Sequence, residues 1–178
     1  MVTKLLKFTG LFLLLTTLTG CPGGDDDCFD YGATARVDNL ITLLPLQSVY
    51  NQGDVITLKI IIPTLNNYFG QELNLFEKTN DLNARLVTTS RYLFTDNQVT
   101  YLKGSMEAYN GGWSNIIYNN VTGEYELEIQ VKLNRIGNYS FFTDDSIEFQ
   151  GSSKCNRYRL DTNIAGWNTD GKIEFSVQ

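Results

Sequence analysis

Residues 124–133 alternate strictly between polar and apolar side chains. The apolar positions are Tyr125, Leu127, Ile129, Val131 and Leu133, and the polar positions are Glu124, Glu126, Glu128, Gln130 and Lys132. A period of two residues matches a β-strand with one buried face, whereas a helix needs a period of about 3.6. Antiparallel sheets commonly keep one face in water, as this pattern requires. The stretch therefore predicts an antiparallel β-sheet protein.

Three further segments have the character of strands. Residues Val55–Ile62 follow an Asn-Gln-Gly-Asp turn and end at a proline, which has no N–H for the ladder of a sheet. Residues Lys172–Val177 follow an Asn-Thr-Asp-Gly turn. Residues Asn138–Phe142 follow a turn at Asn134–Gly137, and we expect them to pair with residues 124–133 as the central hairpin of the domain.

Weaker strand patterns fill most of the remaining chain, and no segment shows a long helical period. They lie at Ala35–Leu43, Leu73–Glu77, Arg85–Phe94, Gln98–Leu102, Ser114–Tyr118, Ser146–Phe149 and Tyr158–Ile164, with one helical turn near Thr79–Ala84. Short strands separated by Gly, Asn and Asp turns predict a single all-β domain built as an antiparallel sandwich. The alternation alone leaves open whether the strands form a sandwich or one closed sheet.

Two short motifs resemble the immunoglobulin-like domains of bacterial surface proteins. One is the turn Asn51–Asp54 before an apolar strand, and the other is Gly137–Tyr139 leading into aromatic residues. The resemblance implies an antiparallel immunoglobulin-like β-sandwich. It implies no particular reaction, because proteins with unrelated functions share this architecture.

The N-terminal residues have the pattern of an export signal. Lys4 and Lys7 precede an apolar run, Phe8–Leu18, that is too short to cross a bilayer core of about 30 Å as a helix. The sequence Leu18-Thr19-Gly20-Cys21 then resembles the lipobox of bacterial lipoprotein precursors. The resemblance implies cleavage after residue 20 and acylation of Cys21, which would attach the mature chain to a membrane. The alternative is an ordinary secretory signal followed by a chance cysteine.

Residues 21–27 form an acidic tether between the anchor and a domain of residues 28–178. Gly and Pro resist regular structure, and Asp25–Asp27 repel one another and stay solvated. The acidic run resembles the sorting signals of surface lipoproteins of Bacteroidota, and it implies an outer-membrane protein exposed on the cell surface. As a simple spacer, the tether would also suit the periplasmic face.

Two cysteines remain after Cys21, and we predict a disulfide between Cys28 and Cys155. An exported chain meets an oxidising compartment, where an even pair of cysteines favours a bridge. The bridge would close a loop of about 127 residues and stabilise the domain by about 4–5 kcal/mol in a chain-entropy argument. The alternative is a pair of buried free thiols.

The complete absence of histidine excludes several classes of chemistry. Ser-His-Asp and Cys-His catalysis and histidine-ligated zinc need a residue that the chain lacks, and three cysteines are too few for an all-thiolate metal site. We expect no cofactor. Loss of Lys4 and Lys7 with the signal, which has no acid, changes the formal charge from −6 to −8. An acidic domain repels phosphate backbones, so nucleic acid is not an expected partner.

Aromatic residues in loop-like settings are the candidate ligand contacts. Trp113 follows Tyr109 and two glycines and precedes Tyr118, and Trp167 lies near a turn. Exposed aromatic faces stack on sugar rings or anchor protein partners. The alternative is that both tryptophans fold back onto the sandwich and plug its edge.

A second candidate site is a modification site at Ser146. The sequence Asp145-Ser146-Ile147 resembles the acceptor motif for O-glycosylation in exported Bacteroidota proteins. The resemblance implies that Ser146 lies on an exposed turn, and we interpret Asp144 and Asp145 as turn residues.

The polar face of residues 124–133 presents three glutamates, Glu124, Glu126 and Glu128, about 7 Å apart at each step. Such carboxylate pairs could serve a glycoside hydrolase, but an alternating acidic face is usually only solvated. The sequence therefore favours a non-catalytic, membrane-anchored binding or envelope-organising lipoprotein with a protein or glycan partner. The first alternative is a carbohydrate-binding accessory lipoprotein of a glycan-uptake system, and the second is a carboxylate-dependent hydrolase.

Overall fold

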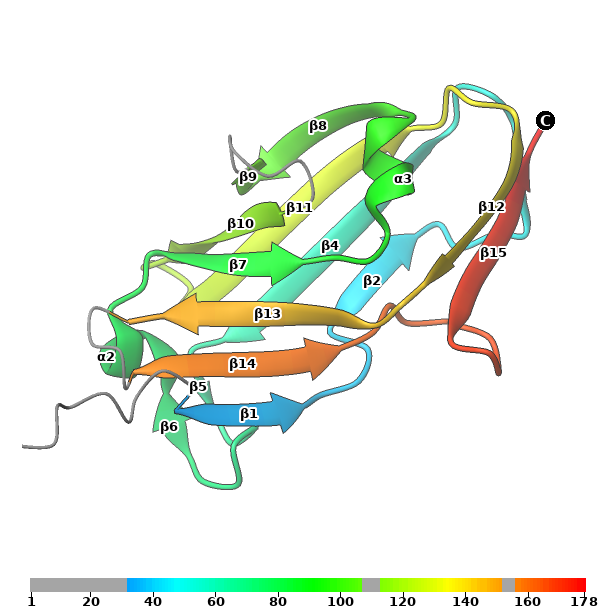
Figure 1. The fold of residues 1–178 in the computed structure, drawn as a ribbon. Helices are drawn as coiled ribbons and strands as arrows, with labels where there is room; N and C mark the ends of the chain where they lie inside the picture. Colours follow the sequence, from blue (N-terminus) through cyan, green and yellow to red (C-terminus); the bar gives the residue numbers. More distant parts are fainter. Residues whose placement is uncertain (1–31, 107–112, 152–155) are drawn as a thin grey trace, which may run out of the picture. The chain divides into compact units, whose positions relative to one another are not determined.

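Strand β11 (Glu124–Lys132) lies inside a ten-stranded sheet (Figure 1). The computed structural model describes residues 32–106, 113–151 and 156–178, which all belong to one unit of residues 31–178. In spatial order the sheet contains β1 (Ala33–Arg36), β14 (Arg157–Thr162), β13 (Asp145–Gln150), β7 (Asn83–Val87), β10 (Trp113–Asn119), β11, β4 (Val55–Pro63) and β2 (Ile41–Leu44). Two more strands join it, β8 (Gln98–Lys103) beside β11 and β9 (Ser105–Met106) beside β10.

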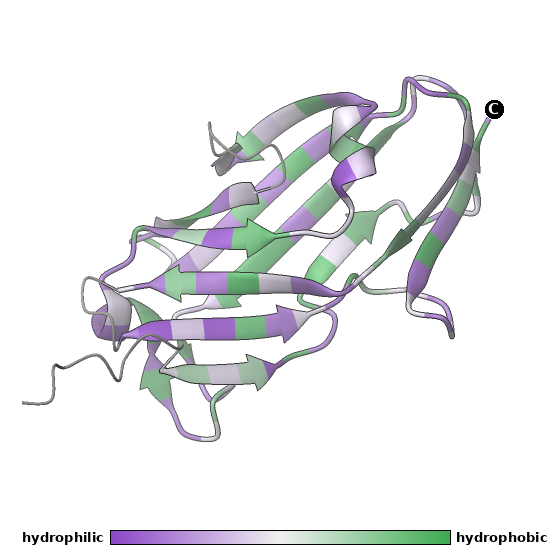
Figure 2. Ribbon diagram, in the orientation of Figure 1, coloured by the Kyte–Doolittle hydropathy of each residue, from purple (hydrophilic) through white to green (hydrophobic). Residues whose placement is uncertain are grey.

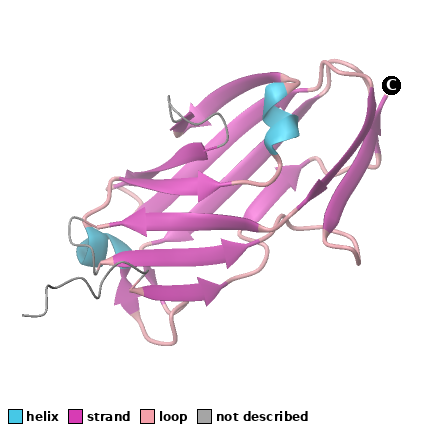
Figure 3. Cartoon of the chain, viewed as in Figure 1, coloured by secondary structure: helices cyan, strands magenta, loops and turns pink. Residues whose placement is uncertain are grey.

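The remaining elements are short. A three-stranded sheet consists of β12 (Gly137–Phe142), β15 (Lys172–Val177) and β3 (Val49–Tyr50), and a two-stranded sheet consists of β5 (Leu65–Asn66) and β6 (Leu73–Asn74). Helices α2 (Leu75–Thr79) and α3 (Arg91–Thr95) have five residues each. Figure 3 shows how small the helical part of the described chain is beside its strands.

The ten-stranded sheet folds over so that its two halves face each other across one core. Ile41 in the end strand β2 forms a parallel bridge with Ile164, which follows β14, the second strand from the other end of the sheet. The N–H of Ala165 also donates to Ile41 O at 2.7 Å. Across the core, the rings of Tyr125 in β11 and Phe149 in β13 meet edge to face with centroids 5.0 Å apart.

The predicted alternation determines which side chains enter this core. The fully buried residues of the two nine-residue strands, β4 and β11, are Ile56, Leu58, Ile60, Ile62, Tyr125, Leu127, Ile129 and Val131. Figure 2 shows the alternation as bands of apolar and polar residues along the strands. Each fully buried aliphatic side chain contributes about 1.5–3 kcal/mol relative to an exposed one. The all-β prediction is thus confirmed: the fold is a mainly antiparallel sandwich, and among the described strands only β1–β14 and β15–β3 pair in parallel.

The predicted central hairpin is wrong. Strand β11 pairs with β4 along one edge and with β10 and β8 along the other, so neither edge remains for β12. After β11, the N–H of Leu133 donates to Asp54 O at 2.9 Å, which extends the pairing with β4 by one residue. The chain then turns at Gly137, whose φ of 135° favours glycine, and β12 pairs with β15 in the smaller sheet.

The strand predicted at Ala35–Leu43 is interrupted and forms two strands, β1 and β2. Asn39 adopts a left-handed conformation with φ 65°, and its N–H donates to Asn163 Oδ1 at 2.6 Å. Asparagine tolerates this conformation better than most residues. The break lets β1 occupy one edge of the large sheet and β2 the other, so local alternation alone does not reveal it.

Two other predicted strands are half helical. The segment Leu73–Glu77 contains β6 and most of α2, and Arg85–Phe94 contains parts of β7 and α3. Asn74 Oδ1 accepts the N–H of Glu77 at 3.2 Å and caps α2. The helical turn expected at Thr79–Ala84 is misplaced, because Asn80, with φ 52°, ends α2 there.

Within the residues that the structure describes, no helix has both the length and the hydrophobicity needed to span a membrane.

Candidate functional site

Hollows on the described part of the chain combine exposed apolar residues with polar groups, and one of them forms where strands separate. Strand β8 runs beside β11 up to Lys103, and β9 then runs beside β10 from Ser105. Gly104, between them, has φ 88°, and a Cβ atom there would overlap Leu127 Cδ1 and lie 2.5 Å from Asn115 O. Only glycine fits this crossing without displacing its neighbours. The chain thus changes partner strands at Gly104 and leaves a pocket, the fork pocket.

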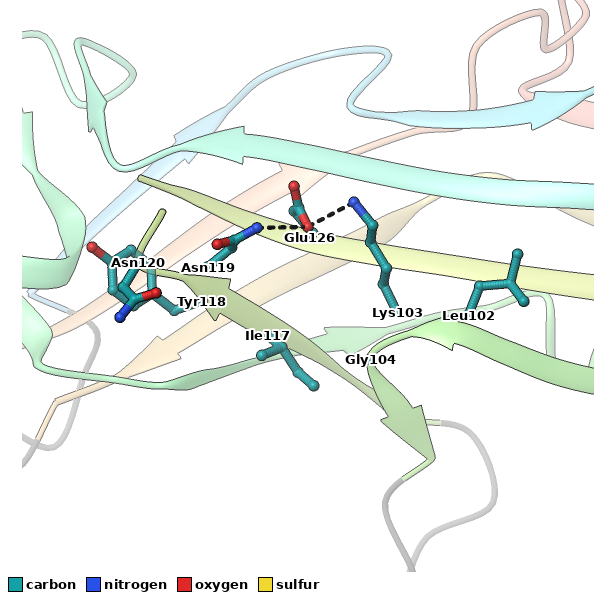
Figure 4. A pocket seen from close by; sticks show the side chains of 8 residues that line it. All are labelled: Leu102, Lys103, Gly104, Ile117, Tyr118, Asn119, Asn120 and Glu126. Carbon is teal, nitrogen blue, oxygen red and sulfur yellow. Dashed lines mark hydrogen bonds and ion pairs between the residues drawn. The ribbon is translucent and has the colours of Figure 1, made fainter. Parts of the chain in front are cut away.

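The fork pocket has a volume of about 460 Å³ and is open to solvent. Its lining residues come from β8, β10, β11 and the turn after β10, and are Leu102, Lys103, Gly104, Ile117, Tyr118, Asn119, Asn120 and Glu126 (Figure 4). Leu102 and Ile117 are exposed apolar side chains at this pocket. The pocket therefore offers apolar contact, two amides and one pair of opposite charges.

Among the described residues that line the fork pocket, Glu126 is the only carboxylate, and its charge is already compensated. Lys103 Nζ donates to Glu126 Oε2 at 2.8 Å, and Asn119 Nδ2 donates to the same oxygen at 3.4 Å. The hydrogen bond from Lys103 lowers the pKa of Glu126 and raises the pKa of Lys103, so both groups stay charged. This geometry holds a carboxylate in its ionised state and provides no second acid for a glycosidase pair.

The solvated face predicted for the three glutamates is only partly correct. Glu124 and Glu128 are partly exposed, but Glu126 is only 8% exposed. Cross-strand neighbours explain the difference, because Glu126 lies between Ile61 of β4 and Ile117 of β10 while Lys103 reaches it from β8. A buried carboxylate needs such a partner to remain charged.

Tyr118 contributes to the fork pocket but is largely a packing residue. Its ring stacks on Phe76 of α2 with centroids 3.9 Å apart and an interplanar angle of 13°. It also contacts the Tyr125 ring, with centroids 5.5 Å apart. Only part of Tyr118 therefore remains available to a ligand.

Trp113 is the first residue of β10 rather than a loop residue, and its ring is engaged. The guanidinium carbon of Arg85 lies 4.4 Å from the ring centroid, a cation–π contact. Trp113 and Tyr118 are five positions apart on one strand, so their side chains point to opposite faces of the sheet. The structure thus does not bring these two candidates together, and Tyr109 lies outside the described residues.

Trp167 is the predicted aromatic that the structure presents to solvent. It is 42% exposed and borders a hollow of about 190 Å³, the Trp167 hollow. The hollow is lined by Arg36, Phe142, Thr143, Asp144, Asn163, Trp167 and Gly171. Phe142 is 58% exposed, and Lys172 Nζ lies 4.9 Å from the centroid of its ring. Two exposed aromatic side chains therefore meet several polar groups at this hollow.

A network of hydrogen bonds positions the polar side chains of the Trp167 hollow. Asn163 is 2% exposed, and its Nδ2 donates to Asp38 Oδ1 at 3.0 Å. Arg36 Nε donates to the same Asp38 oxygen at 3.0 Å, and Arg36 Nη1 lies 3.9 Å from Asp144 Oδ1. The side chain of Asp144 is 82% exposed, so its carboxylate can accept hydrogen bonds from a ligand.

The loop that carries Trp167 is also held in place. Asn168 Oδ1 accepts the N–H groups of Asp170 and Lys172 at 3.0 and 2.9 Å. The N–H of Asn168 donates to Lys172 O at 2.8 Å. Gly166 has φ 90°, and a Cβ atom there would overlap Leu46 Cδ2, so the backbone before Trp167 packs closely on Leu46. The hollow is therefore preformed.

Sequence reasoning missed Phe142, Arg36 and Asp144 as partners of Trp167. The sequence pattern could have indicated that Phe142 is exposed. It follows the inward residue Phe141 and is therefore an aromatic residue on the outward face of β12. No local sequence pattern indicated Arg36, because β1 reaches the hollow only through its pairing with the distant strand β14. The sequence placed no two of these residues together.

The prediction that Ser146 and Asp145 lie on an exposed turn is wrong. Both begin β13, and Ser146 is only 4% exposed, so the folded domain does not offer its hydroxyl to a glycosyltransferase. Asp145 Oδ1 accepts the N–H of Thr89 at 2.8 Å, and its buried Oδ2 has no hydrogen-bond partner. Burial raises the pKa of Asp145, and the hydrogen bonds from Thr89 offset only part of this effect.

The predicted lipidation and disulfide sites, Cys21, Cys28 and Cys155, lie outside the described residues. Among the described residues, no group of three Cys, Asp or Glu side chains is arranged to hold a metal ion.

Comparisons with known proteins do not assign a family. No family model and no curated protein matches the chain. Among solved structures, the chain is similar to the ASH / PapD-like domain of human CEP192 (PapD-like domain 7). That similarity covers 76% of this chain and 84% of the other, with 7% identity and a TM-score of 0.22. Similarity at this level carries no argument about function.

Proposed function

We propose that the chain is a non-catalytic binding module, anchored by lipid on Cys21 to the outer membrane and exposed on the cell surface. The lipobox supports the anchor, and the acidic tether at residues 22–27 supports surface exposure. In this proposal a disulfide between Cys28 and Cys155 joins the start of the domain to its last quarter and stabilises the folded domain. The envelope, not the cytoplasm, is then where a partner or ligand is met.

The Trp167 hollow is the observation that carries the binding role. Two aromatic side chains, Trp167 and Phe142, remain exposed although the fold has a large core in which to bury them. The loop that carries Trp167 is fixed by Asn168, so these side chains are held ready for a partner. Aromatic anchors of this kind dominate many binding surfaces.

The arrangement of carboxylates supports a non-catalytic role over the hydrolase alternative. Among the described residues, the linings of the fork pocket and of the Trp167 hollow contain one carboxylate each, Glu126 and Asp144 respectively. Glu126 is neutralised by Lys103, which suits neither a general acid nor a nucleophile. A glycosidase pair would need two carboxyl groups on opposite sides of one cleft.

A second candidate function is that of a carbohydrate-binding accessory lipoprotein in glycan uptake. The mixture of aromatic rings with an exposed carboxylate in the Trp167 hollow favours it, because sugars present both C–H faces and hydroxyl groups. In this version the membrane anchor serves to keep a glycan near an uptake system.

The anchor is tested by comparing the wild-type chain with Cys21→Ala. We expect the wild-type protein to be found in the membrane fraction and to be cleaved by protease added to intact cells. We expect the Cys21→Ala variant to be released from the membrane. Resistance to protease until the envelope is opened would place the domain in the periplasm and contradict surface exposure. Membrane association of Cys21→Ala equal to that of wild type would contradict the lipid anchor.

The binding role is tested by a photo-crosslinking amino acid introduced at Phe142 in the cell. The matched control position is Val121, which is 89% exposed in the turn between β10 and β11, away from the hollow. We expect a crosslinked product from position 142 that is absent from position 121. Identical products from both positions, or none from position 142, would contradict a binding role for the Trp167 hollow.

A further inference from the structure

We propose that the Trp167 hollow binds a single uncharged sugar ring, the terminal pyranose of a neutral glycan. The inference rests on the binding role proposed above and names the ligand of the same site. Four properties of the hollow carry it: its two aromatic faces, its polar groups, its size and its balance of charge.

The chemistry of the lining matches a pyranose. A pyranose ring has faces of C–H groups and a periphery of hydroxyl groups, so it needs an apolar surface beside hydrogen-bonding groups. Trp167 and the exposed part of the Phe142 ring, which Lys172 covers on one face, supply the apolar surface. Asp144 supplies an exposed acceptor for hydroxyl donors. Arg36, which lies at the same hollow, supplies donors from its guanidinium group. An aliphatic ligand would make no use of these donors and acceptors.

The size of the hollow limits the ligand to one ring. Pockets that enclose a drug-sized molecule have volumes of about 300–1,000 Å³, whereas this hollow has about 190 Å³. A chain of several sugar units or a folded peptide segment would therefore extend beyond it. The end of a glycan, with the remaining units in solvent, fits this limit.

The charges around the hollow favour a neutral ligand. Arg36 and Lys172 carry two positive charges, and Asp38 and Asp144 carry two negative ones. Asp38 holds Arg36 through a hydrogen bond of 3.0 Å, and Lys172 lies over the Phe142 ring. Asp144 is the charged group with the most exposed side chain in the lining, so an acidic sugar would meet a like charge.

The rigidity of the site increases the affinity that one ring can reach. Asn163 is buried and holds both Asp38 and the N–H of Asn39, and Asn168 fixes the loop of Trp167. A preformed site loses little conformational freedom on binding. A single ring still makes few contacts, so we expect dissociation constants on the order of 1 mM, or about 4 kcal/mol of binding free energy.

The two tryptophans of the chain allow a direct test by fluorescence. The variant Trp113→Phe leaves Trp167 as the only tryptophan, so emission reports on the hollow alone. The mature chain with this substitution is titrated with the methyl glycosides of glucose, galactose, mannose and N-acetylglucosamine. Glucuronic acid tests charge, and cyclohexanol tests simple apolar binding. Acrylamide quenching measures how far each compound shields the Trp167 ring.

We expect at least one neutral glycoside to shift the emission saturably and to protect Trp167 from acrylamide. Glucuronic acid and cyclohexanol should each bind about ten-fold more weakly. The carboxylate of glucuronic acid meets the like charge of Asp144, and cyclohexanol lacks most of the hydroxyl groups. In the Trp113→Phe background, Asp144→Ala should weaken binding of that glycoside about ten-fold. By calorimetry on the wild-type background, Trp167→Ala should abolish binding and the matched variant Trp113→Ala should preserve it.

The proposal is overturned if no neutral glycoside protects Trp167 in a folded chain, or if glucuronic acid or cyclohexanol binds as tightly as the best glycoside. Unchanged affinity in Asp144→Ala or Trp167→Ala overturns it as well. The photo-crosslinking test at Phe142 contains no added sugar and does not assume a glycan. A crosslinked partner found there without any sugar binding would therefore reject the ligand class and retain the binding role.

Discussion

Lys103 Nζ lies 2.8 Å from Glu126 Oε2 and joins the end of β8 to β11 where the strands separate. The lysine side chain is partly exposed, whereas the glutamate side chain is nearly buried. This pair explains how the centre of the sheet accommodates a charge beside Ile61 and Ile117. It also makes the stability of the domain dependent on pH.

Glu126→Gln should remove a stabilising contribution that is present at neutral pH. The pKa of Glu126 lies below its ordinary value of 4.5, so the unfolded chain takes up this proton first as the pH falls. The contribution is therefore complete above pH 4.5 and is lost as the pH falls through the lower folded pKa. Urea denaturation of both proteins from pH 7 to pH 3 should show their difference in free energy of unfolding shrinking over that window. The variant Lys103→Met should show the same loss, and a difference independent of pH would contradict this account.

Asp145→Asn should have the opposite pH dependence. Burial raises the pKa of Asp145 above its ordinary value of 3.8, so the folded protein binds this proton more tightly than the unfolded chain does. Wild type therefore loses stability relative to Asp145→Asn as the pH rises from 3.8 through the raised folded pKa. Denaturation curves of the two proteins between pH 3 and pH 7 measure this difference.

The variant Asp145→Ala separates the charge from the hydrogen bonds. It removes the acceptor of the Thr89 N–H and hydroxyl that Asp145→Asn keeps, so we expect Asp145→Ala to be less stable than Asp145→Asn by about 1–3 kcal/mol at every pH. If the difference in free energy of unfolding between Asp145→Asn and wild type does not change with pH, the buried carboxylate does not titrate as described.

Gly104→Ala should destabilise the domain far more than Gly70→Ala. Both glycines have positive φ, 88° and 80°, so each substitution costs about 1–2 kcal/mol of backbone strain. A Cβ at Gly104 also overlaps Leu127 and approaches Asn115 O, whereas nothing lies within 4 Å of a Cβ at Gly70. The overlap should add about 1–3 kcal/mol, measured by urea denaturation. Equal losses in the two variants would show that β8 can move away from the crossing.

The cysteine pair is tested by mass spectrometry of the unfolded, unreduced protein. We expect peptides containing Cys28 and Cys155 to be joined and to separate on reduction. The double variant Cys28→Ser, Cys155→Ser should lose about 4–5 kcal/mol of unfolding free energy relative to oxidised wild type. Alkylation of both thiols before reduction would contradict the disulfide.

The position of the hollow shows why sequence reasoning reached only part of the candidate site. Trp167 is a candidate from the sequence because it lies near a turn, where an aromatic side chain can face solvent. Arg36 lies 131 residues earlier in β1 and reaches the hollow because β1 pairs with β14. Trp113 had the same local signal as Trp167 but lies on a strand under Arg85. Exposure depends on neighbours that local sequence does not specify.

The all-β class and the buried face of each main strand can be predicted from the amino-acid sequence, because side chains alternate across a strand whatever its partners are. The pairing of the strands, β11 with β4, β8 and β10 and β12 with β15, becomes known only from the folded domain. Alternation is a local property, whereas pairing depends on which edges remain free after distant segments have met. The same long-range pairing buries Ser146 and Glu126 and leaves Trp167 exposed beside Phe142.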